Sequence, residues 1–238
     1  EILDESATIM RSLGYEIGFK IDPGAEKVAF VDERGIWYTS LRLLTIVTKL
    51  FLETNRDREP YRIAVPVQAA QEIEMIVAGH NIEVVRIRNS HSAMMDATKD
   101  EKVLFVGGTR GGFIFPDFHA ASDGMYSACR ILQMLAQTGY LLSDLDQSLP
   151  KRHQSTINVP CPWESKGTVM RRTMEHSEHM ERLLVDGVKI FEGDVSILLV
   201  PDREHATFTV TAEANDADTA ASVRDRYAQL VADWRDGR

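Results

Sequence analysis

Hydrophobic and polar positions recur along this chain with two spacings, one typical of helices and one typical of strands. Up to residue 57, the pattern predicts a helix at 4–13, strands at 17–21 and 28–31, a short segment at 36–38 that pairs back as a hairpin, and an apolar helix at 41–52. The polar run at 53–60 lacks either spacing and predicts a linker.

Strands and helices alternate after this linker. We expect strands at 61–67, 83–87, 103–106 and 113–115, and helices at 68–78, 90–97 and 123–137. Strands separated by helices of this length favour a parallel or mixed sheet that is covered by helices. The pattern therefore predicts an α/β domain at 58–148.

The order of elements changes near Leu149-Pro150. The remaining pattern predicts strands at 155–159, 188–191, 196–200 and 207–213, and helices at 166–179 and 216–234. Consecutive strands with short connections favour antiparallel hairpins, so we expect an α+β domain at 149–238 with helices on one face of its sheet. The predicted fold class is α/β followed by α+β.

The composition is that of a globular protein. The chain has 238 residues, of which 44% are hydrophobic, and this is enough to bury a core. Its net charge of −9 argues against a nucleic-acid or anionic-membrane surface, because either surface needs a concentrated basic patch. No apolar stretch approaches the length of a membrane span. We therefore expect a cytoplasmic protein with no nucleic-acid or membrane partner.

Two further features concern the context of the chain. Its two cysteines, Cys129 and Cys161, lack metal-ligand spacing, which argues against a structural zinc site or a disulfide framework. The sequence begins at Glu1 with neither Met nor a signal sequence, so we expect it to be part of a longer protein.

The loop at 22–27 looks like a metal-binding loop that has lost ligands. A loop with Asp at alternate positions would hold Mg²⁺ through three hard oxygen ligands. Here Asp22 occupies the first of these positions, Gly24 the second and the longer Glu26 the third. Whether the chain is an enzyme depends on this loss.

Two other loops offer candidate chemistry. The loop at 107–116 contains four glycines, which lets a ligand approach the backbone; a tight turn packed under a helix is the alternative. In the loop at 200–206, Arg203 and His205 offer cationic groups to a phosphate, although the residue content is also that of an ordinary hairpin.

The order of these loops, with Asp123-Gly124 after the second and Pro201 in the third, resembles the phosphohexomutases, the family of phosphomannomutase and phosphoglucomutase. The resemblance extends over residues 1–235. It implies the end of the family's second domain at 1–57, its third domain at 58–148 and its fourth at 149–238. The first domain, which carries a phosphoserine in the family, has no counterpart, so no serine here inherits a nucleophilic role.

The resemblance assigns candidate residues to each loop, with many substitutions. The family's metal loop, Asp-x-Asp-x-Asp-Arg, implies a magnesium site at Asp22 and Glu26 with Lys27 facing the ligand, and we expect that Mg²⁺ binding has been lost. The family's sugar loop, Gly-Glu-x-Ser-Gly-His, corresponds to residues 108–113. The candidate sugar-binding residues there are Thr109, Arg110, Gly111 and Gly112.

Two further assignments come from the same comparison. The family's phosphate loop, Arg-x-Ser-Gly-Thr-Glu-Pro, corresponds to residues 200–206, and it retains Arg203 and His205 as candidates beside two added acids. His91 lies at a strand-to-helix junction where the family contacts its ligand; a solvated histidine at the start of a helix is the alternative.

These losses shape the functional hypotheses. Phosphoryl transfer depends on neutralising charge, and each charged hydrogen bond contributes roughly 1.5–3 kcal/mol, so the substitutions predict a chain that is inactive as a mutase. Its role would then be ligand sensing or assembly with missing N-terminal domains, with homo-oligomers as a further option. The resemblance extends to the mutase-like region fused to sugar-nucleotide pyrophosphorylases of the mannose-1-phosphate guanylyltransferase type.

Two alternatives stay open. One is a divergent phosphomannomutase or phosphoglucomutase fragment that interconverts hexose 1- and 6-phosphates, with Mg²⁺ still held by Asp22 and Glu26 and a sugar phosphate beside Gly111 and Gly112. The other is a structural interaction module. Whether the chain is an enzyme is left open by the sequence.

Overall fold

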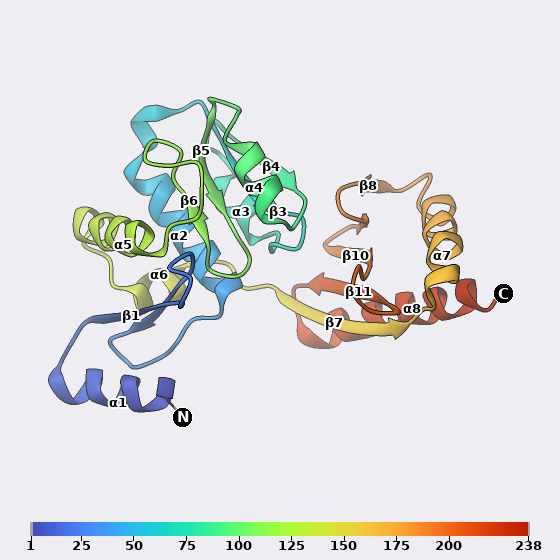
Figure 1. Cartoon of the computed structure of the whole chain (residues 1–238), viewed down its shortest axis with the longest axis horizontal. Helices are drawn as coiled ribbons and strands as arrows, with labels where there is room; N and C mark the ends of the chain where they lie inside the picture. The colour runs from blue at the N-terminus through green and yellow to red at the C-terminus, as the bar shows by residue number, and fades with distance from the viewer. Residues whose placement is uncertain (1, 238) are drawn as a thin grey trace. The chain divides into compact units, whose positions relative to one another are not determined.

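The computed structural model describes residues 2–237, with the side chains of residues 5–237, and it divides into two compact units that meet in sequence at Pro150 and Lys151 (Figure 1). The first unit contains, in chain order, α1 (Ile2–Leu13), β1 (Ile17–Ile21), β2 (Val28–Asp32), α2 (Ser40–Thr54), the short 3-10 helix η1 (Arg56–Arg58), β3 (Tyr61–Pro66), α3 (Glu72–Val77), β4 (Ile82–Ile87), α4 (His91–Ala97), β5 (Val103–Gly107), β6 (Phe113–Ile114), α5 (Gly124–Thr138) and α6 (Leu142–Ser148).

The main sheet of the first unit has the strand order β4-β3-β5-β6. Strand β3 is parallel to both of its neighbours, and β6 is antiparallel to β5. The chain leaves β3 for one edge and then returns past it to β5, which places α3 and α4 on opposite faces of the sheet. This arrangement confirms the predicted α/β class with a mixed sheet.

Helix α2 is the central helix of this unit. It begins after Thr39, whose side chain accepts a hydrogen bond from the backbone N–H of Arg42 at 3.2 Å. Apolar side chains lie on most of its surface, which is typical of a buried helix. Phe51 stacks on Phe105 of β5, with 5.1 Å between ring centroids, and it also contacts Phe115. These aromatic contacts fix α2 against the sheet.

The β1–β2 hairpin positions the candidate site. Its antiparallel register pairs Lys20 with Ala29 and Ile21 with Val28. Val28 and Phe30 lie on one face and are buried in the main core near α5. The opposite face is covered by α1 only near Val31, which leaves the end with Lys20 accessible.

The segment at 36–38 pairs back on β2, as predicted, through an isolated antiparallel bridge between Val31 and Trp37. The carboxylate of the fully buried Asp32 accepts hydrogen bonds from the backbone N–H of Ile36 and from the Tyr38 hydroxyl. Backbone hydrogen bonds from Asp32 N to Ile36 O and from Tyr38 N to Phe30 O, each at 3.1 Å, complete the pairing.

The second unit contains β7 (His153–Pro160), α7 (Trp163–His176), β8 (Glu181–Leu183), β9 (Val188–Glu192), β10 (Val195–Pro201), β11 (Thr207–Ala214) and α8 (Ala217–Arg235). Its sheet has the order β7-β11-β10-β9-β8, and every pairing is antiparallel. In β11, Phe208, Val210 and Ala212 are buried and alternate with threonines, as expected for a sheet with one covered face. The α+β prediction is confirmed.

Short elements account for most differences from the predicted pattern. Helix α6 and strand β8 were not predicted, and η1 lies within the predicted linker. Helix α3 begins at Glu72, four residues later than expected, because the chain first turns through a hydrogen bond from Ala69 N to Pro66 O. The division of the first unit at residue 57 stays a prediction. Within residues 2–237, no helix combines the length and apolar character needed to cross a bilayer.

Candidate functional site

Three segments of the first unit meet at one place. The backbone N–H of Val28, at the end of the 22–27 loop, donates to the carbonyl of Gly111 in the glycine loop at 2.9 Å. The backbone N–H of Gly124, at the start of α5, donates to the carbonyl of Ala25 at 2.7 Å. These two hydrogen bonds join the loop resembling a metal site, the loop resembling a sugar site and the N-terminus of α5.

Glycine is required where these segments touch. Gly111 has φ of +86°, and a Cβ there would lie 2.6 Å from the carbonyl oxygen of Val28. A Cβ at Gly124 would lie 3.0 Å from the carbonyl oxygen of Lys27. The glycine loop is itself closed by a hydrogen bond from Gly108 N to Gly112 O at 2.8 Å. Close packing between loops therefore accounts for part of the glycine content.

Asp22 orders its own loop. Its Oδ1 atom accepts hydrogen bonds from the backbone N–H groups of Glu26 and Lys27, each at 2.8 Å. The hydrogen bond from Lys27 is the largest cause that holds the pKa of Asp22 below its usual value, and the Glu26 N–H and the Lys27 charge act in the same direction. This carboxylate is therefore ionised and engaged with backbone.

A cavity of about 220 Å³ lies beside Asp22. Its lining consists of Lys20, Asp22, Lys27, Val28, Ala29, Ser40 and Arg110. The hairpin register explains why Lys20, Asp22 and Lys27 lie close together. Lys20 pairs with Ala29, and just beyond this pair Asp22 N donates a hydrogen bond to Lys27 O. Arg110 joins them because the adjacent Gly111 is bonded to β2.

The charge of this cavity is mainly positive. Three cationic side chains, those of Lys20, Lys27 and Arg110, line it together with one carboxylate. Throughout residues 5–237, no salt bridge to any of these three side chains is found. Among the lining residues, Asp22 is the one acid beside them.

The residues at this place do not fit a magnesium ion. Asp22 already accepts two backbone hydrogen bonds, Gly24 has no side chain to offer, and the exposed Glu26 does not line the cavity. Among the residues that the structure describes, no group of three or more His, Cys, Asp or Glu side chains is arranged to hold a metal ion. The neighbouring lysines would also repel a divalent cation.

The other predicted sugar-site residues lie at the edge of this region. Thr109 donates from its hydroxyl to Asn89 Oδ1 at 3.3 Å, which links the glycine loop to the junction between β4 and α4. His91 is exposed at the first residue of α4, where Ser90 caps the helix by accepting from Ala93 N at 3.2 Å. Of the predicted sugar-loop side chains, only that of Arg110 lines the cavity.

Lys20 and Ser40 are lining residues that the sequence analysis missed. Lys20 stands two positions before Asp22 on β1, so the two-residue period of a strand places both side chains on one face. That spacing was the available signal. Ser40 is brought in by the start of α2, which no local pattern relates to the 22–27 loop.

The 200–206 loop belongs to the second unit and is internally bonded. Asp202 Oδ1 accepts from the backbone N–H of Glu204 at 2.8 Å and of His205 at 2.9 Å. These hydrogen bonds hold the pKa of Asp202 below its usual value, and the one from Glu204 has the largest effect. The buried Lys166 donates to the carbonyls of Asp202 and His205, the latter at 2.6 Å, with its Nζ 3.5 Å from the Trp163 ring centroid. The side chains of Asp202 and of Lys166 on α7 therefore already form hydrogen bonds with the backbone of this loop.

The two cationic candidates of this loop face acids of the same unit. Arg203 pairs with Asp186 at 2.7 Å. His205 Nδ1 lies 3.3 Å from Asp202 Oδ1. In this structure both side chains are engaged locally.

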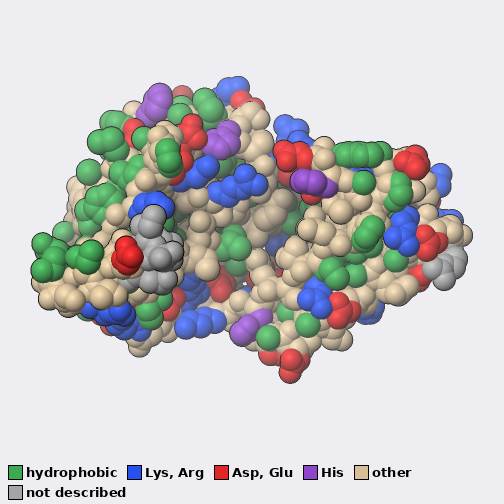
Figure 2. All heavy atoms as spheres, turned by 60° about the horizontal axis from the view of Figure 1, so that its bottom comes forward, with side chains coloured by type: hydrophobic (Ala, Val, Ile, Leu, Met, Phe, Trp, Pro, Cys, Tyr) green, Lys and Arg blue, Asp and Glu red, His purple; other side chains and the backbone are tan. Residues whose placement is uncertain are grey.

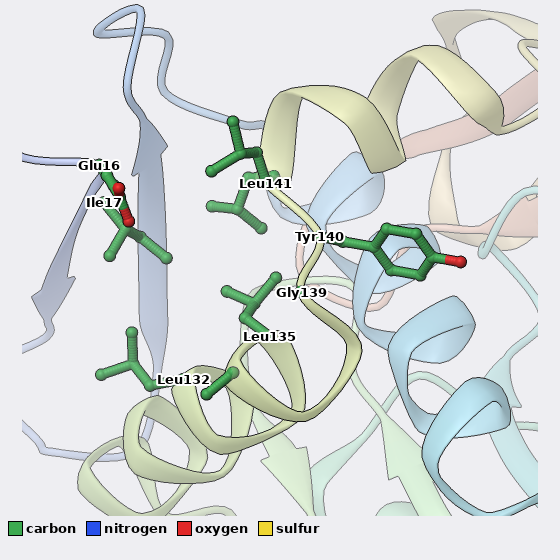
Figure 3. Close-up of a pocket in the computed structure, with 9 residues that line it drawn as sticks. Glu16, Ile17, Leu132, Leu135, Gly139, Tyr140 and Leu141 are labelled. Carbon is green, nitrogen blue, oxygen red and sulfur yellow. The ribbon is translucent and has the colours of Figure 1, made fainter.

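A second cavity, of about 290 Å³, lies between β1 and the end of α5. Figure 3 shows Leu132, Leu135 and Leu141 around a gap that faces Ile17, whereas Tyr140 points away from it. Glu16 is the one charged side chain in its lining. This cavity is apolar and does not suit a phosphate.

Charges elsewhere on the surface are mixed. On the face drawn in Figure 2, the described Lys and Arg side chains are interspersed with Asp and Glu and form no continuous basic surface. This distribution agrees with the net charge of −9.

The fold is similar to that of a known family. Residues 40–153, from α2 to the start of β7, match the family described as phosphoglucomutase/phosphomannomutase, alpha/beta/alpha domain III. A solved phosphoglucomutase/phosphomannomutase family protein from Burkholderia thailandensis aligns with a TM-score of 0.82 and 17% identity, over 98% of this chain and 50% of that chain. The chain therefore has the phosphohexomutase fold.

Curated relatives align with nearly the whole chain. A "Probable phosphoglucosamine mutase" of Methanopyrus kandleri is 29% identical over 233 residues, which are 97% of this chain and 51% of that protein. Its counterpart in Pyrococcus abyssi is 25% identical over 98% of this chain and 52% of its own length. These findings support the phosphohexomutase family for this chain, which spans about half the length of the curated relatives it matches.

A further solved structure shows the fold together with a metal. The N-acetylphosphoglucosamine mutase of Aspergillus fumigatus, in complex with GlcNAc-6P and magnesium, aligns with a TM-score of 0.67 and 11% identity. It covers 91% of this chain, which corresponds to 48% of that one.

Proposed function

We propose that this chain is the C-terminal half of a divergent phosphohexomutase and binds a hexose phosphate where the 22–27 loop, the glycine loop and the start of α5 meet. The observation that carries this proposal is the pair of hydrogen bonds Val28 N to Gly111 O and Gly124 N to Ala25 O. They bring together the two loops whose counterparts in the family bind the metal ion and the sugar.

The sugar is proposed from the relatives. The curated proteins that match nearly all of this chain are named as phosphoglucosamine mutases, so a hexosamine phosphate is the first ligand to test. Glucose and mannose phosphates are the alternatives. The parent that we propose is a mutase rather than a guanylyltransferase fusion, because the matched relatives are mutases about twice as long as this chain.

The role of this half is recognition. Lys20, Lys27 and Arg110 supply positive charge where a phosphoryl group would lie, and the sugar would then lie beside the glycine loop that carries Arg110. The group that gives and takes the phosphoryl would come from the other half of the parent protein.

A backbone amide titration by ¹⁵N NMR tests this function. Glucosamine 6-phosphate is added to the chain, with unphosphorylated glucosamine as the matched ligand control. We expect saturable shifts for the amides of the meeting point, namely Ala25, Lys27, Gly111, Gly112 and Gly124. The absence of saturable shifts with glucosamine, glucose and mannose phosphates alike, or shifts confined to the second unit, would overturn the proposal.

A second candidate function is ligand sensing without turnover. It is favoured by the 200–206 loop, where Asp202 accepts the backbone N–H groups that a phosphate-binding loop would offer to its ligand. An assay of the full-length parent for interconversion of hexose 1- and 6-phosphates separates the two. Turnover supports the mutase, binding without turnover supports sensing, and the absence of both supports a structural module.

A further inference from the structure

We propose that the cavity lined by Lys20, Lys27 and Arg110 binds a phosphate group through its cationic side chains alone, without a magnesium ion. The inference rests on the proposed function for the identity of the molecule that carries the phosphate. The charge of the cavity is independent of the proposed function.

The three cations come from separate segments that the backbone holds together. Lys20 lies on β1, Lys27 lies where the hairpin loop returns to β2, and Arg110 lies in the glycine loop. The pairing of Lys20 with Ala29 and the hydrogen bond from Val28 N to Gly111 O fix these segments beside one another. A tetrahedral dianion can accept hydrogen bonds from several sides, so donors from three directions suit it.

The charge balance favours an anion over a cation. The lining holds three positive side chains and one carboxylate, and that carboxylate already accepts the N–H groups of Glu26 and Lys27. No salt bridge within residues 5–237 engages the three cations. In a chain with a net charge of −9, this local excess of positive charge is otherwise unexplained.

The size of the cavity fits a phosphate group rather than a whole sugar phosphate. Sites for complete small molecules have volumes of roughly 300–1,000 Å³. This cavity has about 220 Å³ and opens beside the glycine loop. The phosphate would occupy the cavity, with the Ser40 hydroxyl as a further donor, and the sugar would extend out of it on the side of Arg110.

The resulting site differs from a metal-loop site in the source of its positive charge. Where a magnesium ion would neutralise the phosphate in a loop with three acids, two lysines and an arginine would do so here. The replacement of one carboxylate by Gly24, and the position of the exposed Glu26 outside the cavity lining, then accompany a change of chemistry rather than a loss of binding.

Calorimetric titration of the chain with inorganic phosphate tests this inference. We expect the same dissociation constant in EDTA and in Mg²⁺. We expect Lys20→Gln, Lys27→Gln and Arg110→Gln each to weaken phosphate binding by about fivefold or more, as for the loss of a partly exposed charge contact. Lys27→Arg keeps the charge and should bind like the unmodified chain.

Lys99→Gln is the matched control, because Lys99 is an exposed lysine of the same unit that pairs only with Asp96 nearby. It should leave phosphate binding unchanged. Circular dichroism and thermal unfolding verify that each variant is folded. Binding that requires Mg²⁺, or cavity variants that bind as tightly as Lys99→Gln, would overturn the inference.

The outcomes also separate this inference from the proposed function. Phosphate binding in EDTA without any shift at the glycine loop on adding hexose phosphates would support the cavity and contradict the proposed ligand. Hexose phosphate binding that depends on Mg²⁺ would support the proposed function and contradict the cation-only site.

Discussion

The Oδ1 atom of Asp22 lies 2.8 Å from the backbone nitrogen of Lys27 and accepts its hydrogen bond. This contact turns the carboxylate toward its own loop and fixes the backbone from which the Lys27 side chain reaches the cavity. The Oδ1 atom of this acid therefore orders the backbone that carries a cationic side chain. The relationship explains how the loop keeps its shape with Gly24 and Glu26 at its other two candidate ligand positions.

Asp22 contributes to stability through these backbone hydrogen bonds. Its pKa is held below the usual value of 3.8, so the contribution is complete above that pH and is lost as pH falls through the lower folded-state value. We expect Asp22→Ala to lower the urea midpoint at pH 7 and to have less effect at pH 3. Asp22→Asn, which keeps an acceptor, should lose less than Asp22→Ala. Urea unfolding at both pH values checks this; an effect of Asp22→Ala that grows toward pH 3 would refute it.

The same variants test for a metal at Asp22. Because this carboxylate is engaged with backbone, added Mg²⁺ should leave the melting temperature of the unmodified chain unchanged. A magnesium-dependent rise in melting temperature that disappears in Asp22→Asn would contradict our reading of the loop.

The close packing at Gly111 can be tested by substitution. Gly111→Ala introduces both an unfavourable positive φ and a Cβ at 2.6 Å from the Val28 carbonyl oxygen. Gly79→Ala is the matched control, because Gly79 has φ of +84° but no atom within 4 Å of the place that a Cβ would occupy. We expect Gly79→Ala to cost about 1–2 kcal/mol and Gly111→Ala about 1–3 kcal/mol more. Equal losses in chemical denaturation would show that the loops are not held as described.

Lys166 is the anchor of the 200–206 loop. Lys166→Met removes the donor to the carbonyls of Asp202 and His205 and the contact with Trp163, so it should lower the stability of the second unit by about 2–3 kcal/mol. Arg171→Met, at an exposed position on the same helix, should cost less than about 0.5 kcal/mol. Urea unfolding compares the two variants. If they proved equally stable, Lys166 would not be holding the loop.

Helix α7 also contains a glycine that lowers its stability. Gly167 lies inside this helix, is exposed, and has open space where a Cβ would stand. Gly167→Ala should raise the stability of the second unit by about 0.5–1 kcal/mol, because alanine loses less backbone entropy in a helix. A decrease in the thermal unfolding midpoint would contradict this expectation.

The long elements could be predicted from the sequence because their patterns agree with their packing. Strand β1 was predicted with its observed bounds, and α2 and α5 were predicted to within two residues at either end. Helix α6 was missed because it has seven residues and begins after Leu141, which provides no side-chain cap. Strand β8 was missed because its three residues begin with the charged pair Glu181 and Arg182.

The candidate site was less predictable, since its key contacts join residues far apart in sequence. The three candidate loops were identified, and the fold they implied is confirmed. The direction of the Asp22 carboxylate and the gathering of Lys20 and Arg110 depend on strand register and on the bond to Gly111, which no local pattern specifies. The roles of these residues stay predictions.

Calorimetric titration of this chain with glucosamine 6-phosphate, in EDTA and then in Mg²⁺, tests the central claim most directly. A hexose phosphate held by Lys20, Lys27 and Arg110 should bind with the same dissociation constant in both buffers. Binding seen only with Mg²⁺, or no binding in either buffer, would contradict the account.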